Sequence, residues 1–304
     1  MAFTAKDVQA LREKTGCGMM DCKKALVECD GDMDKAVDFL REKGLASQAK
    51  KSGRVAAEGA VATFVDGKVG AMVEVNVETD FVAGGDPFKE LVDKIAVVVA
   101  KENPADVDAL LKCEYEGKTV EQLVQDLFLV VRENIQVRRF ARVEGSVVSY
   151  VHAGGRIGVL VNFETSDEIA ANDEFVAMAK DVAMQIAAIN PAYLNKESVP
   201  QADFDHEKEI LVAQMKEDPK MANKPEQVLQ KIVEGKMGKF YKENCLTEQD
   251  FVKNGDITVA KYIEDCAKKL GGEIKIVGLT RFEKGEGIQK REDDFAAEVA
   301  SMVK

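Results

Sequence analysis

Two carboxylates, Glu78 and Asp80, have the types and spacing that could do chemistry. They lie two residues apart at the end of an expected strand, so they share a face and could act as a general acid and a general base. No third group or phosphate-binding glycine loop accompanies them, and the chain has only two histidines, His152 and His206. The sequence therefore offers few residues for a nucleophilic triad or for a zinc site. We expect a protein that is not an enzyme and that has no cofactor or metal site of its own.

The net charge and the cysteines indicate which partners and which cellular compartment to expect for the chain. Its 304 residues include 42 basic and 54 acidic side chains, which gives a net charge of −12. Phosphate backbones and anionic lipids repel such a chain, so we expect no direct nucleic-acid partner and no membrane association. The six cysteines include no CxxC pair, and the start of the chain lacks the apolar core of a signal peptide. These features indicate a cytoplasmic protein.

The elements that must position any functional group begin with a helical module. Thr4 and Asp7 form a capping-box pattern that predicts a first helix, and glycines then break the chain before a second. Asp32 is a candidate cap for a third helix, and we expect Gly44 to end it. Residues 1–54 are therefore predicted to be a three-helix module with a polar linker.

An internal repeat organises the next part of the chain. Glu58–Val61 and Glu144–Val147 open two similar segments, each with alternating apolar residues that predict a strand hairpin. The hairpin turns are expected at 66–67 and 152–155, and a helix with apolar spacing follows each hairpin. The predicted fold class is α+β, with two related subdomains that each pack helices on an antiparallel sheet.

The remaining segments complete a five-part organisation. A helix is expected between the repeats over about 119–133, and two charged helices around prolines predict an antiparallel helical hairpin that projects from the body. A short amphipathic helix is expected at the C-terminus, over Asp293–Lys304. The expected domains are the N-terminal module 1–54, the first core subdomain 55–143, the second core subdomain 144–202 continued by 242–280, the helical hairpin 203–241 and the C-terminal module 281–304.

The two repeats differ in type at one position of the short connection between strand and helix. The first connection is Thr79–Ala83 and the second is Ser166–Ala170, and Phe81 in the first corresponds to Glu168 in the second. A carboxylate there indicates a water-facing position, so Phe81 could be an exposed aromatic anchor for a partner. It could equally fold into a local core that the second repeat lacks, and these residues alone leave both readings open.

Other candidate residues have a structural and a functional interpretation. Met19 and Met20 start a predicted helix, where apolar side chains are more often core than partner contacts. We expect Cys22 to be a buried, inert thiol and His152 to be a polar surface residue of a hairpin turn. The arginines of a basic cluster are expected to form ion pairs within this acidic chain: Arg138, Arg139 and Arg142.

Several longer runs resemble the elongation factor Ts family. Residues 15–26 (TGCGMMDCKKAL) are similar to its N-terminal signature, and residues 76–83 (NVETDFVA) to its second signature. The similarity covers essentially the whole chain in the family's order, although the segment from about 255 to 278 looks longer than in bacterial members. The other matching runs are 154–159, 233–237 and 281–288.

The resemblance implies a guanine-nucleotide exchange factor for elongation factor Tu. The N-terminal module would be ubiquitin-associated-like and would dock on the G domain of that protein, with Met19 and Met20 as secondary contacts. Thr79, Asp80, Phe81 and Val82 would displace the Mg²⁺ that holds GDP, with Phe81 as a wedge.

The resemblance also assigns roles to the other parts of the chain. The second subdomain and the hairpin would carry further contacts and dimerisation, giving a homodimer or a two-plus-two complex, and the C-terminal helix would clasp the G domain. The alternative is a non-catalytic structural dimer or holdase that uses the helical hairpin.

Overall fold

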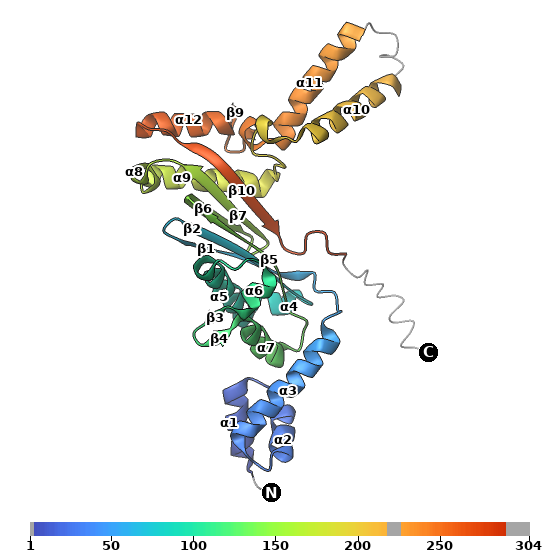
Figure 1. Ribbon diagram of the computed structural model, residues 1–304, viewed down its shortest axis with the longest axis vertical. Helices are drawn as coiled ribbons and strands as arrows, with labels where there is room; N and C mark the ends of the chain where they lie inside the picture. The colour runs from blue at the N-terminus through green and yellow to red at the C-terminus, as the bar shows by residue number, and fades with distance from the viewer. Residues whose placement is uncertain (1–2, 218–225, 290–304) are drawn as a thin grey trace.

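The computed structural model of the chain describes residues 3–217 and 226–289. Figure 1 shows three regions along its long axis: a helical module at the N-terminus, a layered core of helices and sheets, and a helical hairpin at the far end. Helices and antiparallel sheets occur together, which confirms the α+β class. The C-terminal helix expected over 293–304 lies outside the described residues.

The N-terminal module contains three helices around a small apolar core. The hydroxyl of Thr4 accepts a hydrogen bond from the amide of Asp7, and the carboxylate of Asp7 accepts one from the amide of Thr4. The predicted capping box is therefore confirmed. Asp32 caps the third helix through the amides of Asp34 and Lys35. The helices are α1 (Ala5–Thr15), α2 (Met19–Glu28) and α3 (Met33–Lys51).

The third helix is longer than predicted. It continues through Gly44 to Lys51, so the expectation that Gly44 ends it was wrong, and most of the expected linker is helical. A Cβ atom at Gly44 would lie 2.1 Å from Cδ2 of Leu129. The glycine therefore permits a close approach between α3 and helix α7 (Val120–Val131) rather than ending a helix.

The first core subdomain is a three-stranded antiparallel sheet with helices on one face. The predicted hairpin is confirmed, with Asp66 paired to Val69 across the turn. The third strand, β5, was not predicted; it pairs with the hairpin from across a long insertion, giving the order β1-β2-β5. Its elements are β1 (Glu58–Asp66), β2 (Val69–Val77), α4 (Asp80–Ala83), α5 (Asp86–Glu102), α6 (Val107–Lys112), β3 (Glu114–Tyr115), β4 (Lys118–Thr119), α7 and β5 (Gln136–Glu144).

The second core subdomain repeats this plan with a strand borrowed from later in the chain. Its sheet has the order β10-β7-β6, so the expected border between residues 280 and 281 falls inside strand β10. Its elements are β6 (Ser146–His152), β7 (Ile157–Glu164), α8 (Asp167–Ala170), α9 (Asp173–Ile189), η1 (Lys196–Ser198), η2 (Leu246–Glu248), β8 (Asp250–Phe251), β9 (Asn254–Thr258), α12 (Val259–Leu270) and β10 (Lys275–Glu283).

The internal repeat is visible in matching hydrogen bonds as well as in the topology. The side-chain amide of Asn76 donates to the carbonyl of Glu58 at 3.1 Å, and that of Asn162 donates to the carbonyl of Glu144 at 3.0 Å. Each bond ties the second strand of a hairpin to the residue that opens the repeat. The similarity inferred from sequence is therefore also a similarity of structure.

The two sheets pack face to face, with helices on their outer sides (Figure 1). Val61 and Met72 of the first sheet meet Leu160 and Phe282 of the second in a shared apolar layer. A Cβ atom at Gly158 would lie 2.4 Å from Val61, so this glycine lets the sheets approach. The core is thus a stack of helices, sheet, sheet and helices.

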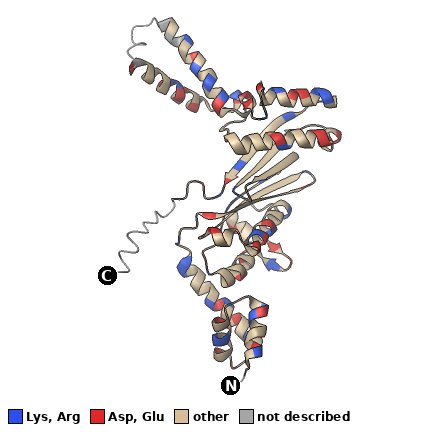
Figure 2. Ribbon diagram, turned by 180° about the vertical axis from the view of Figure 1, so that it is seen from behind, with Lys and Arg blue, Asp and Glu red and all other residues tan. Residues whose placement is uncertain are grey.

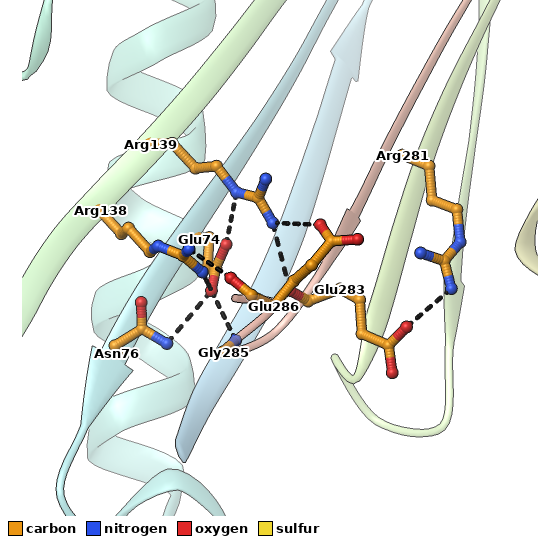
Figure 3. A network of polar contacts seen from close by, with 8 residues as sticks. All are labelled: Glu74, Asn76, Arg138, Arg139, Arg281, Glu283, Gly285 and Glu286. Carbon is orange, nitrogen blue, oxygen red and sulfur yellow. Dashed lines mark hydrogen bonds and ion pairs between the residues drawn. The ribbon is translucent and has the colours of Figure 1, made fainter. Parts of the chain in front are cut away.

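A buried carboxylate connects the first sheet to the chain that leaves the second (Figure 3). Glu74 on β2 has no exposed surface, and it accepts hydrogen bonds from Arg138 at 2.9 Å and from Arg139 at 2.6 Å. It also accepts from the amide of Gly285 at 2.7 Å, while Arg139 pairs with Glu286. The prediction of ion pairing in the basic cluster is therefore confirmed, and the pairing joins segments far apart in sequence.

The helical hairpin projects from the second subdomain, as predicted (Figure 1). It consists of α10 (Gln201–Glu217) and α11 (Glu226–Asn244). In Figure 2 acidic residues predominate along α10, whereas α11 carries both basic and acidic residues. Within the described residues no helix is both long and apolar enough to cross a membrane. Four side chains form the hairpin's own buried contacts: Leu211, Met215, Val233 and Met237.

Candidate partner-binding site

The connection after β2 forms a single helical turn, which we call the α4 turn (Thr79–Ala83). Thr79 caps it, because its hydroxyl accepts a hydrogen bond from the amide of Val82 at 3.3 Å. Ala83 is buried at the base of the turn, whereas Phe81 is 88% exposed. The structure therefore excludes the reading in which Phe81 fills a local core. It presents an aromatic ring to solvent on a capped turn beside Asp80.

Two carboxylates fix the start of the turn: one contacts Thr79, and the other belongs to the preceding residue and anchors it. Glu133, which follows α7, accepts hydrogen bonds from the amide of Thr79 at 3.0 Å and from its hydroxyl at 2.8 Å. Glu78 accepts from the amide of Asn134 at 2.7 Å. Sequence reasoning missed Glu133, since it lies 54 residues from Thr79 and no local pattern relates the two.

The acid–base interpretation of Glu78 and Asp80 has little support in the geometry. One oxygen of Glu78 accepts the amide of Asn134 and the other lies 3.4 Å from the guanidinium of Arg54. Glu78 therefore has a structural task, and Asp80 lies exposed at the start of α4. Among residues 3–217 and 226–289, no group of three or more His, Cys, Asp or Glu side chains is placed to hold a metal ion.

A second exposed apolar pair lies on the N-terminal module. Met19 and Met20 begin α2, and they are 43% and 73% exposed. The core interpretation of these residues was wrong, because the buried face of α2 is formed by Cys22, Ala25 and Leu26 instead. Unbranched, polarisable methionines at a surface are suited to contacts with a partner.

The remaining sequence candidates are structural or peripheral. Cys22 is fully buried, and burial raises the pKa of its thiol, as expected for an inert cysteine. His152 is exposed at the end of β6, directly before the hairpin turn, with its Nδ1 2.9 Å from the hydroxyl of Tyr150. The buried thiol and the exposed imidazole are as predicted, although His152 ends the strand rather than lying in the turn. Neither residue adds a reacting group to the site.

Comparisons with known proteins agree with this architecture. A family model described as "Elongation factor TS" matches residues 78–286, which include the α4 turn, strand β5 of the first sheet and all three strands of the second. The protein named "Elongation factor Ts" from Clostridium botulinum (strain ATCC 19397 / Type A) is 49% identical over 305 residues, covering 98% of this chain and 97% of its own length. That of Clostridium kluyveri (strain NBRC 12016) is 48% identical over 309 residues, covering 99% of each chain. The chain therefore belongs to the elongation factor Ts family of proteins of translation elongation.

Proposed function

We propose that this chain is a guanine-nucleotide exchange factor. It binds elongation factor Tu in its GDP-bound and nucleotide-free forms and promotes GDP release by displacing the Mg²⁺ ion of that complex. Membership of the elongation factor Ts family supports the partner, and the exposed ring of Phe81 on a capped and braced turn is the observation that carries the mechanism. The chain transforms no substrate, so it needs no general acid, base or cofactor.

The mechanism requires that the factor bind one state of its partner better than another. Only a difference in affinity between nucleotide-free and GDP-bound partner shifts the equilibrium, and the coupling is reciprocal. Mg²⁺ demands near-octahedral oxygen ligands, so a small displacement of those ligands is costly. Phe81 acts as the wedge that produces the displacement, and Thr79, Asp80 and Val82 place it.

Magnitudes show that Phe81 does not act alone. Burial of a phenylalanine side chain contributes about 1.5–3 kcal/mol, roughly one to two decades in an equilibrium constant. An exposed charge such as that of Asp80 contributes only about 0–1 kcal/mol, which suits a positioning role rather than competition for the metal. Further surfaces must hold the wedge against the partner, and the exposed Met19 and Met20 supply one of them.

The test is release of a fluorescent GDP analogue from elongation factor Tu, followed by stopped flow. Wild-type chain should accelerate release, and calorimetry should show tighter binding to the nucleotide-free partner than to the GDP-bound one. Equal affinity for the two forms, or release at the spontaneous rate with the chain in excess, would refute an exchange function.

A structural dimer or holdase built on the helical hairpin is the second candidate. The projection of α10 and α11 favours it, together with the exposed side chains of Ile210 and Val228. Sedimentation of the wild-type chain and of a hairpin-deleted chain, combined with the GDP-release assay on both, separates the candidates. A dimer that is lost with the hairpin, combined with unchanged GDP release, would assign the hairpin to self-association within an exchange factor or a two-plus-two complex.

A further inference from the structure

The residues that follow helix α7 contact both the N-terminal module and the α4 turn, which are far apart in the sequence. Arg132 ends the helix in the left-handed conformation, at φ 60°, and its guanidinium lies 2.9 Å from the carboxylate of Asp21 on α2. Its carbonyl accepts a hydrogen bond from Nζ of Lys51 at 2.6 Å. Arg132 therefore anchors two helices of the N-terminal module to the core.

The next residue reaches the α4 turn. The two oxygens of Glu133 accept from the amide and the hydroxyl of Thr79, and the same hydroxyl accepts from the amide of Val82. A hydroxyl has one proton, so donation to Glu133 leaves its lone pairs free to face Val82. The carboxylate thus fixes the rotamer of the residue that caps the turn bearing Phe81.

The third residue, Asn134, contacts the segment that connects the N-terminal module to β1. Asn134 is buried, and its amide nitrogen donates to Glu78 while its side chain donates to the carbonyls of Ser52 at 3.2 Å and Arg54 at 2.8 Å. Those two carbonyls belong to the segment that connects the N-terminal module to β1. Three consecutive residues thus touch the module, the turn and the connection between them.

The second repeat provides an internal comparison. Ser166 caps helix α8 through the amide of Ile169 at 3.3 Å, so the cap itself is common to both repeats. In the described part of the chain, however, no carboxylate accepts a hydrogen bond from Ser166, and the position of Phe81 is taken by the exposed Glu168. The brace is found on the repeat that presents an aromatic ring to solvent.

We propose that Glu133 is a positioning residue for Phe81, and that Arg132 and Asn134 join this braced turn to the N-terminal module as one unit. This inference rests on the proposed exchange function for its consequence, though not for its geometry. A ring held in its binding position before contact avoids the cost of ordering it on association. The contact surfaces at Met20 and Phe81 then reach the partner in a fixed relation.

The first test needs no partner. The chain contains no tryptophan, so Phe81→Trp introduces a single reporter at a highly exposed position. In time-resolved anisotropy of the full chain, adding Glu133→Ala should raise the amplitude of the fast nanosecond motion of Trp by roughly twofold. Thr79→Val, which removes the hydroxyl, should act similarly, and Thr79→Ser should restore the wild-type signal. Glu168→Ala is the matched control, because it removes an exposed carboxylate from the other repeat.

The second test asks whether the brace works through Phe81. Glu133→Ala should lower the saturating rate of GDP release by roughly threefold to tenfold, and should have no further effect in a Phe81→Ala chain. Circular dichroism of each variant checks that the fold is retained.

The outcomes separate the two proposals. Unchanged anisotropy in the Glu133→Ala and Thr79→Val chains overturns the positioning role, and so do additive losses with Phe81→Ala. If the wild-type chain does not accelerate GDP release from elongation factor Tu, the exchange function is refuted. The anisotropy result alone then decides whether Glu133 positions residue 81.

Discussion

Replacement of Glu74 by Gln should destabilise the core, because this residue joins two arginines and a distant backbone amide inside the protein (Figure 3). One oxygen of Glu74 accepts from Arg138, Asn76 and Gly285, and the other accepts from Nε of Arg139. Gln retains one accepting oxygen but turns an NH₂ group toward Arg139, which leaves two donors facing each other.

The magnitude follows from the burial of the pair. Removal of one partner of a buried ion pair costs about 3–5 kcal/mol. Glu74 is fully buried, but the side chains of Arg138 and Arg139 are 28% and 31% exposed and can regain water. We therefore expect a loss of about 2–3 kcal/mol in the free energy of unfolding. Glu144→Gln is the matched control: its side chain is 66% exposed beside Arg142, so it should cost about 0–1 kcal/mol.

Urea unfolding followed by circular dichroism measures the difference between the two variants. Hydrogen exchange at the amide of Gly285 gives a local measurement, because this amide loses a charged acceptor in the Glu74→Gln chain. Equal destabilisation by the two substitutions, or unchanged exchange at Gly285, would refute the reasoning that the buried network holds the segment after β10 against the first sheet.

Three further predictions concern the N-terminal module and the thiols. Gly44→Val should lower the free energy of unfolding by about 1–3 kcal/mol in a melting experiment, because its side chain would collide with Leu129. Hydrogen bonds from the cap amides lower the pKa of Asp32 below 3.8, so its contribution is present above that pH and is lost as the pH falls through the lowered value. Asp32→Ala should therefore lose helical circular dichroism relative to wild type at neutral pH, and the difference should vanish on acidification; a constant difference would contradict this. Cys29 and Cys113, the partly exposed cysteines, should react first with a thiol reagent, while equal rates for all six would contradict the burial.

The local parts of the fold could be predicted because their signals are local. The capping box at Thr4 and Asp7, the turn at 66–67 and the apolar spacing of α5 and α9 each depend on residues a few positions apart. The pairing partners of β5 and β10 could not be predicted in the same way, because strand pairing across a long insertion has no nearby pattern. The prediction that Gly44 ends α3 failed for a similar reason, because this glycine permits a tertiary contact with Leu129 that no local pattern shows.

At the candidate site, too, the features with a local sequence signal could be predicted and those that depend on tertiary packing could not. The comparison of the repeats identified position 81 as special, but an exposed anchor and a local core residue have the same sequence pattern, and only the 88% exposure of Phe81 separates them. Glu133 had no signal at all, because its relation to Thr79 exists only after α7 and the first sheet have packed together.

The most direct measurement compares GDP release from elongation factor Tu by the wild-type chain, its Phe81→Ala variant and the control Glu168→Ala. Loss of the ring, and of the burial that it would gain against the partner, should slow the accelerated release by roughly tenfold to a hundredfold, while the control should match wild type. Release by Phe81→Ala at the wild-type rate would contradict the account, because the exposed ring on the α4 turn would then not be the element that drives exchange.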